Sequence, residues 1–212
     1  MPNILIMPCS NGKFNYPFIK DGKEYKVVAN PINEDQLSLK DIQNIIKEQK
    51  DEHLIEAYKL YKNKNYRTIY NHYKDNLYIY SALFGLINAN FKICSYNATF
   101  SKTTAKGPLP SEVVVNKDTY HYDFGSDIGN KDLPIDIAVS KNYIKPLLES
   151  LSKYVEPNRL IRIHSKSEDT FNIAKKIDYF TNIHYIKYDY KQGTNVHYTI
   201  IKEHLLGERN EG

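Results

Sequence analysis

The sequence predicts an α/β domain of three layers, in which helices cover both faces of a mostly parallel sheet of four or five strands. Short, continuous apolar runs predict strands that are buried on both faces. Longer segments with apolar residues every three or four positions separate these runs, and this alternation predicts parallel strands joined by right-handed crossovers. The expected strands are residues 4–7, 77–83, 135–139, 160–164 and 183–188.

The length and composition of the chain fit one such domain. It has 212 residues, of which 41% are hydrophobic, and this is enough for one sizeable core. We therefore expect a single α/β domain over residues 1–206. The polar residues 207–212 are expected to fray, as chain ends without packing partners do.

Three helices are expected between the first two strands, at residues 38–49, 52–62 and 65–74. Ser38 is placed to cap the first of them. In the other two, tyrosines recur at helical spacing, as Tyr66 and Tyr70 do, and so form one face. A face of this kind predicts packing against the core rather than a binding surface.

The next two helices have recognisable starts. Ser140 precedes an apolar stripe at helical spacing, and Pro146 is tolerated near the start if the helix begins around Asn142 or later. Ser165 and Glu168 have the spacing of a capping box, in which each residue satisfies a backbone N–H of the first helical turn. Both starts directly follow expected strands.

The remaining segments are a last helix and two irregular parts. Thr194 is expected to cap the last helix, which ends near Gly207. Residues 18–28 predict a small N-terminal hairpin with Asp21-Gly22 at its turn. Residues 101–133 are rich in glycine and proline and predict a long, lid-like insertion, because long irregular segments in compact domains are often binding loops.

Composition limits the classes of function. The net charge of +4 permits contact with phosphates without demanding it. Two cysteines do not make a disulfide framework, and they suit a reducing compartment. The N-terminus lacks the pattern of a signal peptide, and the longest apolar run is too short to cross a bilayer. We therefore expect a cytoplasmic protein that does not contact membranes, and we leave its oligomeric state open.

Polar residues follow most of the expected strands. Because the carboxyl ends of parallel strands share one edge of a sheet, and ligands bind there, these exits predict a site. Hydroxyls, lysines and the N-termini of helices together favour a bound phosphate, although each Ser or Thr could simply cap a helix. The chain has neither a P-loop nor a G-x-G-x-x-G motif. The exits are Ser10 with Lys13, Ser140 with Lys141, Ser165 with Lys166, and Thr194 near Lys191.

Three separated stretches carry a resemblance to a known family. SALFGL at residues 81–86 ends an expected strand, and SYNAT follows at 95–99. CSNGK at 9–13 follows the first strand, and SKNY at 140–143 follows a later one. In these stretches the chain resembles the YaaA peroxide-stress family and its uncharacterised bacterial and phage relatives.

The resemblance implies a fold like that of uracil-DNA glycosylases, and a link to DNA binding and to modified nucleobases. One position departs from the pattern, because Asn97 stands where the relatives usually have Asp. An amide cannot act as a base, as a carboxylate can, but it can hydrogen-bond the edge of a nucleobase. This change favours binding over carried-over catalysis.

Cys9, His164 and Asn97 are the candidate catalytic residues. Cys9 lies four residues before Lys13, which would favour its thiolate, although a buried thiol at a strand end has the same pattern. His164 leaves a strand directly into Ser165 and could be a general acid or simply a structural hydrogen-bonding group. We expect no metal and no cofactor, since no ligand set has the necessary spacing.

We therefore expect a nucleotide- or nucleobase-binding protein that acts on an N-glycosidic bond, in free nucleotides or in single-stranded or base-flipped nucleic acid. One alternative is a non-catalytic DNA- or nucleotide-binding protein in stress or phage–host conflict. Another is an enzyme for a small phosphorylated metabolite. The expected binding residues are Ser10, Asn11, Lys13, Ser81, Gly85, Tyr96, Ser140, Lys141, Ser165 and Lys166.

Overall fold

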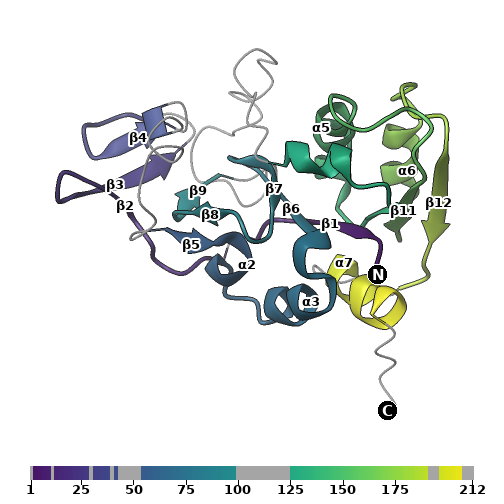
Figure 1. The fold of residues 1–212 in the computed structure, drawn as a ribbon, viewed down its shortest axis with the longest axis horizontal. Coiled ribbons are helices and arrows are strands. Elements are labelled where there is room, and N and C mark those ends of the chain that lie inside the picture. The colour runs from purple at the N-terminus through teal and green to yellow at the C-terminus, as the bar shows by residue number, and fades with distance from the viewer. Residues whose placement is uncertain are drawn as a thin grey trace.

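The computed structural model describes residues 2–10, 12–28, 31–38, 41–42, 54–98, 125–190 and 196–206, and it confirms an α/β fold. The main sheet has six strands in the order β12-β11-β10-β1-β6-β7, one more than the maximum predicted (Figure 1). All neighbouring pairs are parallel except β6 and β7. The strands are β1 (Ile4–Pro8), β6 (Leu77–Ser81), β7 (Gly85–Asn88), β10 (Ile135–Ile137), β11 (Ile161–Ser165) and β12 (Ile183–Lys187).

The centre of the sheet is buried on both faces, as the continuous apolar runs predict. All five residues of β1 and all five of β6 are buried. β1 pairs with β6 on one side, where Leu5 lies opposite Leu77, and with β10 on the other, where Ile4 lies opposite Ile135. A strand with neighbours on both sides and helices on both faces leaves no position for an exposed polar residue.

The sixth strand arises because the predicted strand at 77–83 ends early. The chain turns back after Ser81 and runs antiparallel from Gly85, which pairs with Ser81. Gly85 has a φ of 66°, a conformation that other residues rarely adopt. The Ser81 hydroxyl accepts the backbone N–H groups of Leu83 and Phe84 at 3.2 and 2.9 Å and so holds the turn. The serine and glycine of this stretch therefore make a hairpin.

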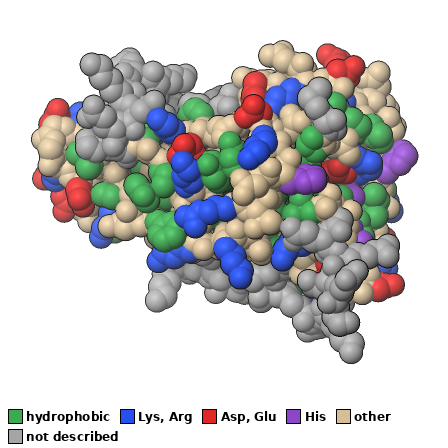
Figure 2. Space-filling model, turned by 60° about the horizontal axis from the view of Figure 1, so that its bottom comes forward, with side chains coloured by type: hydrophobic (Ala, Val, Ile, Leu, Met, Phe, Trp, Pro, Cys, Tyr) green, Lys and Arg blue, Asp and Glu red, His purple; other side chains and the backbone are tan. Residues whose placement is uncertain are grey.

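Helices cover both faces of the sheet. Figure 1 shows α5 and α6 on one side of it and α3 and α7 on the other; Figure 2 brings the side with α3 and α7 forward. α7 continues into one π-helical turn, Ile201–Leu205. The described residues also include two short 3₁₀ turns, Lys74–Asn76 and Ser126–Asn130. The α-helices are α2 (Ala57–Leu60), α3 (Asn65–Tyr73), α5 (Lys141–Leu151), α6 (Glu168–Ala174) and α7 (Val196–Ile200).

The structure confirms one of the three early helices and corrects another. α3 forms as predicted and buries Tyr66 and Tyr73. The helix predicted over residues 52–62 is wrong beyond four residues, because Ile55–Glu56 form strand β5 and the backbone is extended again at Tyr61. Most of the helix predicted at 38–49 lies outside the described residues, although the Ser38 hydroxyl accepts the N–H of Asp41, as a cap does.

The start of α5 also differs from the prediction. The helix begins at Lys141, so Pro146 lies in its second turn rather than its first. A proline there has no N–H to donate to the carbonyl four residues before it. The helix persists because five of its side chains are buried, which offsets the missing bond. The buried residues are Tyr143, Ile144, Leu147, Leu148 and Leu151.

The N-terminal hairpin is confirmed and belongs to a small second sheet. β2 and β3 pair antiparallel, and Asp21 and Gly22 both have positive φ at the turn between them, 52° and 75°. Two residues with positive φ define the turn whose twist matches that of a β-hairpin. β3 also pairs in parallel with β4 and with β9. These strands are β2 (Phe18–Lys20), β3 (Lys23–Val28), β4 (Gln36–Ser38) and β9 (Tyr96–Asn97); separately, β5 pairs with β8 (Lys92–Ile93).

The described end of the predicted insertion is packed rather than open. Most of 101–133 lies outside the described residues. Within its last part, Ile128 is fully buried. A Cβ added to Gly125 would lie 2.9 Å from the carbonyl oxygen of Leu86, and one added to Gly129 would lie 2.5 Å from that of Tyr154. These close approaches fix residues 125–130 against β7 and the end of α5.

The close contact between Gly129 and the Tyr154 carbonyl predicts that adding one methyl group at position 129 destabilises the protein. Gly129→Ala should lower the free energy of unfolding by about 1–3 kcal/mol, the usual effect of overpacking, because the Tyr154 carbonyl cannot swing away as a side chain can. Gly12→Ala is the matched control, since its Cβ would lie 3.9 Å from the nearest atom, Lys62 Cβ. Urea unfolding of the three proteins measures the effect, and equal stability of the two variants would contradict it.

Candidate functional site

The carboxyl ends of the parallel strands meet at one edge of the sheet, as the sequence predicts. β6 and β10 lie on opposite sides of β1, so the connections reverse direction there. In open α/β sheets, ligands bind outside the strand ends near such a reversal. Cys9 follows β1 at this point, and Ser140 precedes α5 after β10. The candidate site is built outward from these two exits.

A cavity of about 260 Å³ lies beside this point, between the exits of β10 and β11 and helix α7. Five of the predicted site residues line it. Hydroxyls, two lysines, two histidines and a few apolar side chains meet there. The lining residues are Val139, Ser140, Lys141, His164, Ser165, Lys166, Ser167, Thr170, Val196, His197 and Ile200.

Ser165 and Ser140, which both line the cavity, differ in the hydrogen bonds that their hydroxyls make. Ser165 is buried, accepts the N–H of Ser167 at 3.0 Å and hydrogen-bonds the Thr170 hydroxyl at 3.2 Å. The predicted capping box of Ser165 and Glu168 is therefore wrong, because Ser167 is the residue at the N-cap. Ser140 is the N-cap of α5, yet its hydroxyl makes no capping bond and faces solvent at the cavity.

The two lysines of the cavity differ in the same way. Lys141 Nζ lies 3.1 Å from Asp169 Oδ2, so its charge is partly compensated. Lys166 forms no ion pair with a carboxylate among the described residues. An anion in the cavity would therefore meet Lys166 as its main uncompensated cation.

His164 is held on both of its ring nitrogens. Nε2 donates to Asp136 Oδ1 at 2.8 Å, and Nδ1 shares a hydrogen bond of 2.9 Å with the Tyr188 hydroxyl. The ring is 3% exposed, so little of it reaches solvent. With both nitrogens engaged, His164 has the role of a structural hydrogen-bonding group rather than that of a general acid.

Asp136, the middle residue of β10, is contacted by three polar side chains. It accepts from Asn3 at 3.0 Å and from His164, and Arg162 contacts both of its oxygens, at 2.8 and 2.9 Å. Burial raises the pKa of Asp136, but the bonds and charges of His164, Asn3 and Arg162 outweigh burial and hold the pKa below its ordinary value. The carboxylate is therefore ionised in the folded protein.

His197 is a cavity residue that the sequence analysis did not select. It lies on α7 next to Tyr198, and its ring faces the cavity. Burial lowers the pKa of His197 to about 4, because the surroundings disfavour a charged ring. It is a neutral imidazole at pH 7. In the sequence, the only indication of its role is that it lies two residues after Asn195, among the polar residues that follow the last expected strand.

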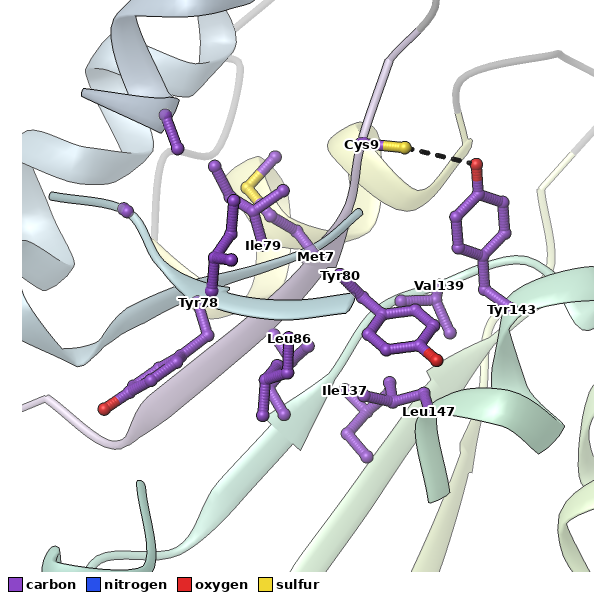
Figure 3. Packing of buried hydrophobic residues seen from close by; sticks show 14 of the residues in the cluster. Met7, Cys9, Tyr78, Ile79, Tyr80, Leu86, Ile137, Val139, Tyr143 and Leu147 are labelled. Atoms are coloured by element: carbon purple, nitrogen blue, oxygen red, sulfur yellow. Dashed lines mark hydrogen bonds between the residues drawn. The ribbon is translucent and has the colours of Figure 1, made fainter. Parts of the chain in front are cut away.

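Cys9 lies in the core and contacts α5. Its sulfur lies 3.4 Å from the Tyr143 hydroxyl, the contact drawn in Figure 3, and accepts the backbone N–H of Ala82 at 3.4 Å. Cys9 is 8% exposed and is absent from the cavity lining. This arrangement matches the buried strand-end thiol that the sequence left open as an alternative to a nucleophile.

A group of buried hydroxyls fills the space beyond β6. The Tyr96 hydroxyl lies 2.9 Å from that of Tyr61 and accepts from Ser81 at 2.8 Å. Burial raises the pKa of both tyrosines well above the ordinary value, so they stay neutral. The Lys13 ammonium lies 4.1 Å from the centre of the Tyr96 ring. Burial lowers the pKa of Lys13, and the neighbouring Cys9 partly opposes this shift.

The other predicted site residues are divided between these places. Ser10 hydrogen-bonds Tyr198 of α7, the residue after His197, and does not itself line the cavity. Asn97 is exposed on β9, which pairs with β3 in the small sheet, so it does not belong to the cavity lining. Gly85 serves the β6–β7 turn, and Asn11 lies outside the described residues.

Comparison with protein-family models, with curated proteins and with solved structures finds no match for the chain. The resemblance to the YaaA family therefore stays a prediction from its motifs. Among the residues that the structure describes, no group of three or more His, Cys, Asp or Glu is placed to hold a metal ion. Over the same ranges no helix has the length and apolar character needed to cross a membrane.

The contacts of Asp136 predict that replacing its carboxylate by an amide destabilises the protein strongly. Asp136→Asn should lower the free energy of unfolding at pH 7 by about 3–5 kcal/mol, because Arg162 keeps its charge with no carboxylate beside it. Since the folded-state pKa of Asp136 is depressed, its contribution is present above the unfolded pKa and disappears as the pH falls through the folded value.

Urea unfolding of both proteins between pH 7 and pH 3 measures this effect. The difference between wild type and Asp136→Asn should shrink below about pH 4, the unfolded value for Asp. Asp132→Asn is a control, since the Asp132 side chain is exposed and its contact with Arg159 is 3.9 Å long. A difference that stays constant over the whole pH range would show that the carboxylate charge is not the cause.

Proposed function

We propose that the protein binds a mononucleotide, or a smaller phosphorylated molecule with a ring, in the cavity beside β10 and β11. The convergence of Lys166, the Ser140 hydroxyl and a neutral imidazole in one cavity carries this proposal. The volume of about 260 Å³ lies just below the roughly 300–1,000 Å³ of ordinary small-molecule sites. It suits one nucleotide and is too small for a dinucleotide.

The phosphate has a natural place at the start of α5. This helix has eleven residues, and its first turn presents unpaired N–H groups and a partial positive charge. Ser140 offers a hydroxyl at the same end, and Lys166 offers an uncompensated ammonium across the cavity. Backbone donors, a hydroxyl and a lysine together make a site suited to an anion.

The ring has a natural place against the apolar side chains of the lining. Val139, Val196 and Ile200 give this part of the lining an apolar surface. His197 stands among them as a neutral imidazole that can both donate and accept a hydrogen bond. A planar base packed on the apolar side chains could be read along its edge by His197. The motifs shared with the YaaA family support the same class of ligand.

Binding is tested by titration calorimetry with the four ribonucleoside monophosphates, their nucleosides and inorganic phosphate. At least one monophosphate should bind, and its nucleoside should bind at least tenfold more weakly. Lys166→Gln should weaken the monophosphate about tenfold or more, because a hydrogen bond to a charged group contributes about 1.5–3 kcal/mol.

Lys176→Gln is the matched control, since Lys176 is exposed just after α6 and does not line the cavity. It should bind as the wild type does. Equal affinity for nucleoside and monophosphate, or equal loss in both lysine variants, would contradict a phosphate site at this place.

A second candidate function, hydrolysis of an N-glycosidic bond, is favoured by one observation. His197 is neutral at pH 7 and faces the cavity, so it can accept a proton from a water molecule that attacks the sugar. His164 cannot take this role while Asp136 and Tyr188 hold both of its nitrogens. If the reaction occurs, His197 rather than His164, Cys9 or Asn97 is the residue placed for it.

Released nucleobase, measured by mass spectrometry after incubation with nucleotides and with DNA that carries modified bases, tests this candidate. A base must be unprotonated to act, so cleavage should fall on the acid side with a midpoint near pH 4 rather than near 6.5. His197→Gln should abolish release and Asn97→Ala should not. Nucleotide binding without release from any substrate would leave the binding function alone.

A further inference from the structure

A second surface of the protein lies away from the cavity, where residues 12–16 run beside α2 and α3. The N–H of Phe14 donates to Leu60 at 2.8 Å, and the N–H of Lys62 donates to Gly12 at 2.9 Å. These bonds fix the two segments side by side. The segments are far apart in sequence, so the surface that they form is a product of the fold.

This surface is rich in cations. Residues 12–20 and 57–74 contain no Asp or Glu, although acidic residues are nearly as frequent as basic ones in the whole chain. Glu56 and Asp75 border the second segment, and their charges add to burial in raising the pKa of Tyr70. Lys59 is paired with Glu56, just before α2. Among the described residues, neither Lys62 nor Arg67 forms an ion pair with a carboxylate. The cations in the two segments are Lys13, Lys20, Lys59, Lys62, Lys64, Arg67 and Lys74.

Aromatic rings lie between these cations. Phe14 is 36% exposed, with the Lys62 ammonium 6.0 Å and the Arg67 guanidinium 5.8 Å from its ring centre. Further along, Tyr70 stacks on Tyr58 with ring centres 3.7 Å apart. Attraction between the ring and the two cations favours this arrangement in the free protein, and the exposed part of the ring is accessible to a partner.

Cations and rings alternate along α3 and at its end. Arg67 and Tyr70 are three residues apart and so lie on the same side of the helix. Lys74 lies just beyond the end of α3, with its ammonium 5.2 Å from the centre of the Tyr70 ring. Figure 2 shows the face to which α2 and α3 belong, with Lys and Arg side chains interspersed among hydrophobic ones. We call Phe14, Lys62, Arg67, Tyr70 and Lys74 the cation–aromatic strip.

We propose that the cation–aromatic strip binds single-stranded nucleic acid. Cations spaced along a helix match the charge of a phosphate backbone, and rings between them offer faces on which bases of any type stack. A duplex hides its base faces, so it could use only the cations. An acidic protein or an anionic membrane would likewise match the charges and leave the rings without a role.

The strip extends the proposed function from free nucleotides to a polymer, and it rests on contacts that do not involve the cavity. Lys13 precedes Phe14, and its ammonium lies over the ring of Tyr96. The strip therefore begins next to the buried hydroxyls of Ser81 and Tyr96, at the exits of β1 and β6. A strand bound along α3 would therefore end at the carboxyl edge of the sheet.

Fluorescence anisotropy with labelled 12-nucleotide single strands of DNA and RNA, and with a 12-base-pair duplex, tests the proposal. The single strands should bind at least tenfold more tightly than the duplex. Lys62→Gln/Arg67→Gln should weaken single-strand binding at least tenfold and lower the slope of log K against log salt by about 1.4, since each phosphate contact on a single strand contributes about 0.7. Phe14→Ala should weaken binding at least fivefold and leave that slope unchanged.

Lys175→Gln/Lys176→Gln is the matched control. It also removes two cations, one of them 5.3 Å from the ring centre of Tyr185, but it lies after α6 on the other half of the sheet. It should bind single strands as the wild type does. Thermal unfolding of each variant checks that the fold is intact.

Three results would overturn the proposal: equal affinity for single strand and duplex, no effect of Phe14→Ala, or equal losses in the two double variants. Binding of the strip to phosphatidylserine vesicles without binding to oligonucleotides would also overturn it. The outcome is separate from that of the cavity, because Lys62→Gln/Arg67→Gln should leave mononucleotide affinity unchanged. If mononucleotides do not bind at all, the strip is still tested by the oligonucleotides alone.

Discussion

The buried carboxylate of Asp136 organises the half of the sheet that carries the cavity. It lies on the central part of β10 and accepts from Asn3 before β1 and from Arg162 and His164 on β11, so it ties three neighbouring strands on one face. A charge this deep is tolerable only when its partners are in place. The carboxylate therefore demands one register of the strands and one rotamer of His164, and the strand exits that follow inherit their positions from it.

The same chain of bonds continues from the sheet to the C-terminal helix. His164 reaches Tyr188 after β12, and the Tyr188 ring packs against His204 with centres 4.4 Å apart. Tyr190 in turn hydrogen-bonds Glu203 and His204 in the π-helical turn after α7. Thus His164 in the cavity lining is joined to the π-helical turn after α7 by hydrogen bonds and one ring contact. These contacts explain why His164, a catalytic candidate from its position at the end of a strand, is a structural hydrogen-bonding group.

The sequence predicted the layers, the parallel strands and the N-terminal hairpin, because each depends on local patterns of burial and turn residues. It also predicted that the residues following the strands lie together, because the carboxyl ends of parallel strands share one edge of the sheet. Five of these residues line the cavity: Ser140, Lys141, His164, Ser165 and Lys166. The prediction failed where a tertiary bond decided the outcome. Ser81 and Gly85 were predicted to bind a ligand, but they stabilise the turn of a β-hairpin. Asn97 lies on β9, which pairs with β3 in another sheet. Neither arrangement can be predicted from residues nearby in the sequence.

His197 shows why the most useful cavity residue escaped a reading of the sequence. α7 has five residues, too few for a helix to persist without packing. Its position depends on the Tyr198 hydroxyl, which donates to Tyr66 of α3 at 2.7 Å and hydrogen-bonds Ser10, and on the buried Ile200. These contacts join α7 to α3 and to the exit of β1, and only then does the adjacent His197 face the cavity. A residue placed by contacts made so far from it in sequence leaves no local pattern, whereas the serines and lysines at the strand ends do.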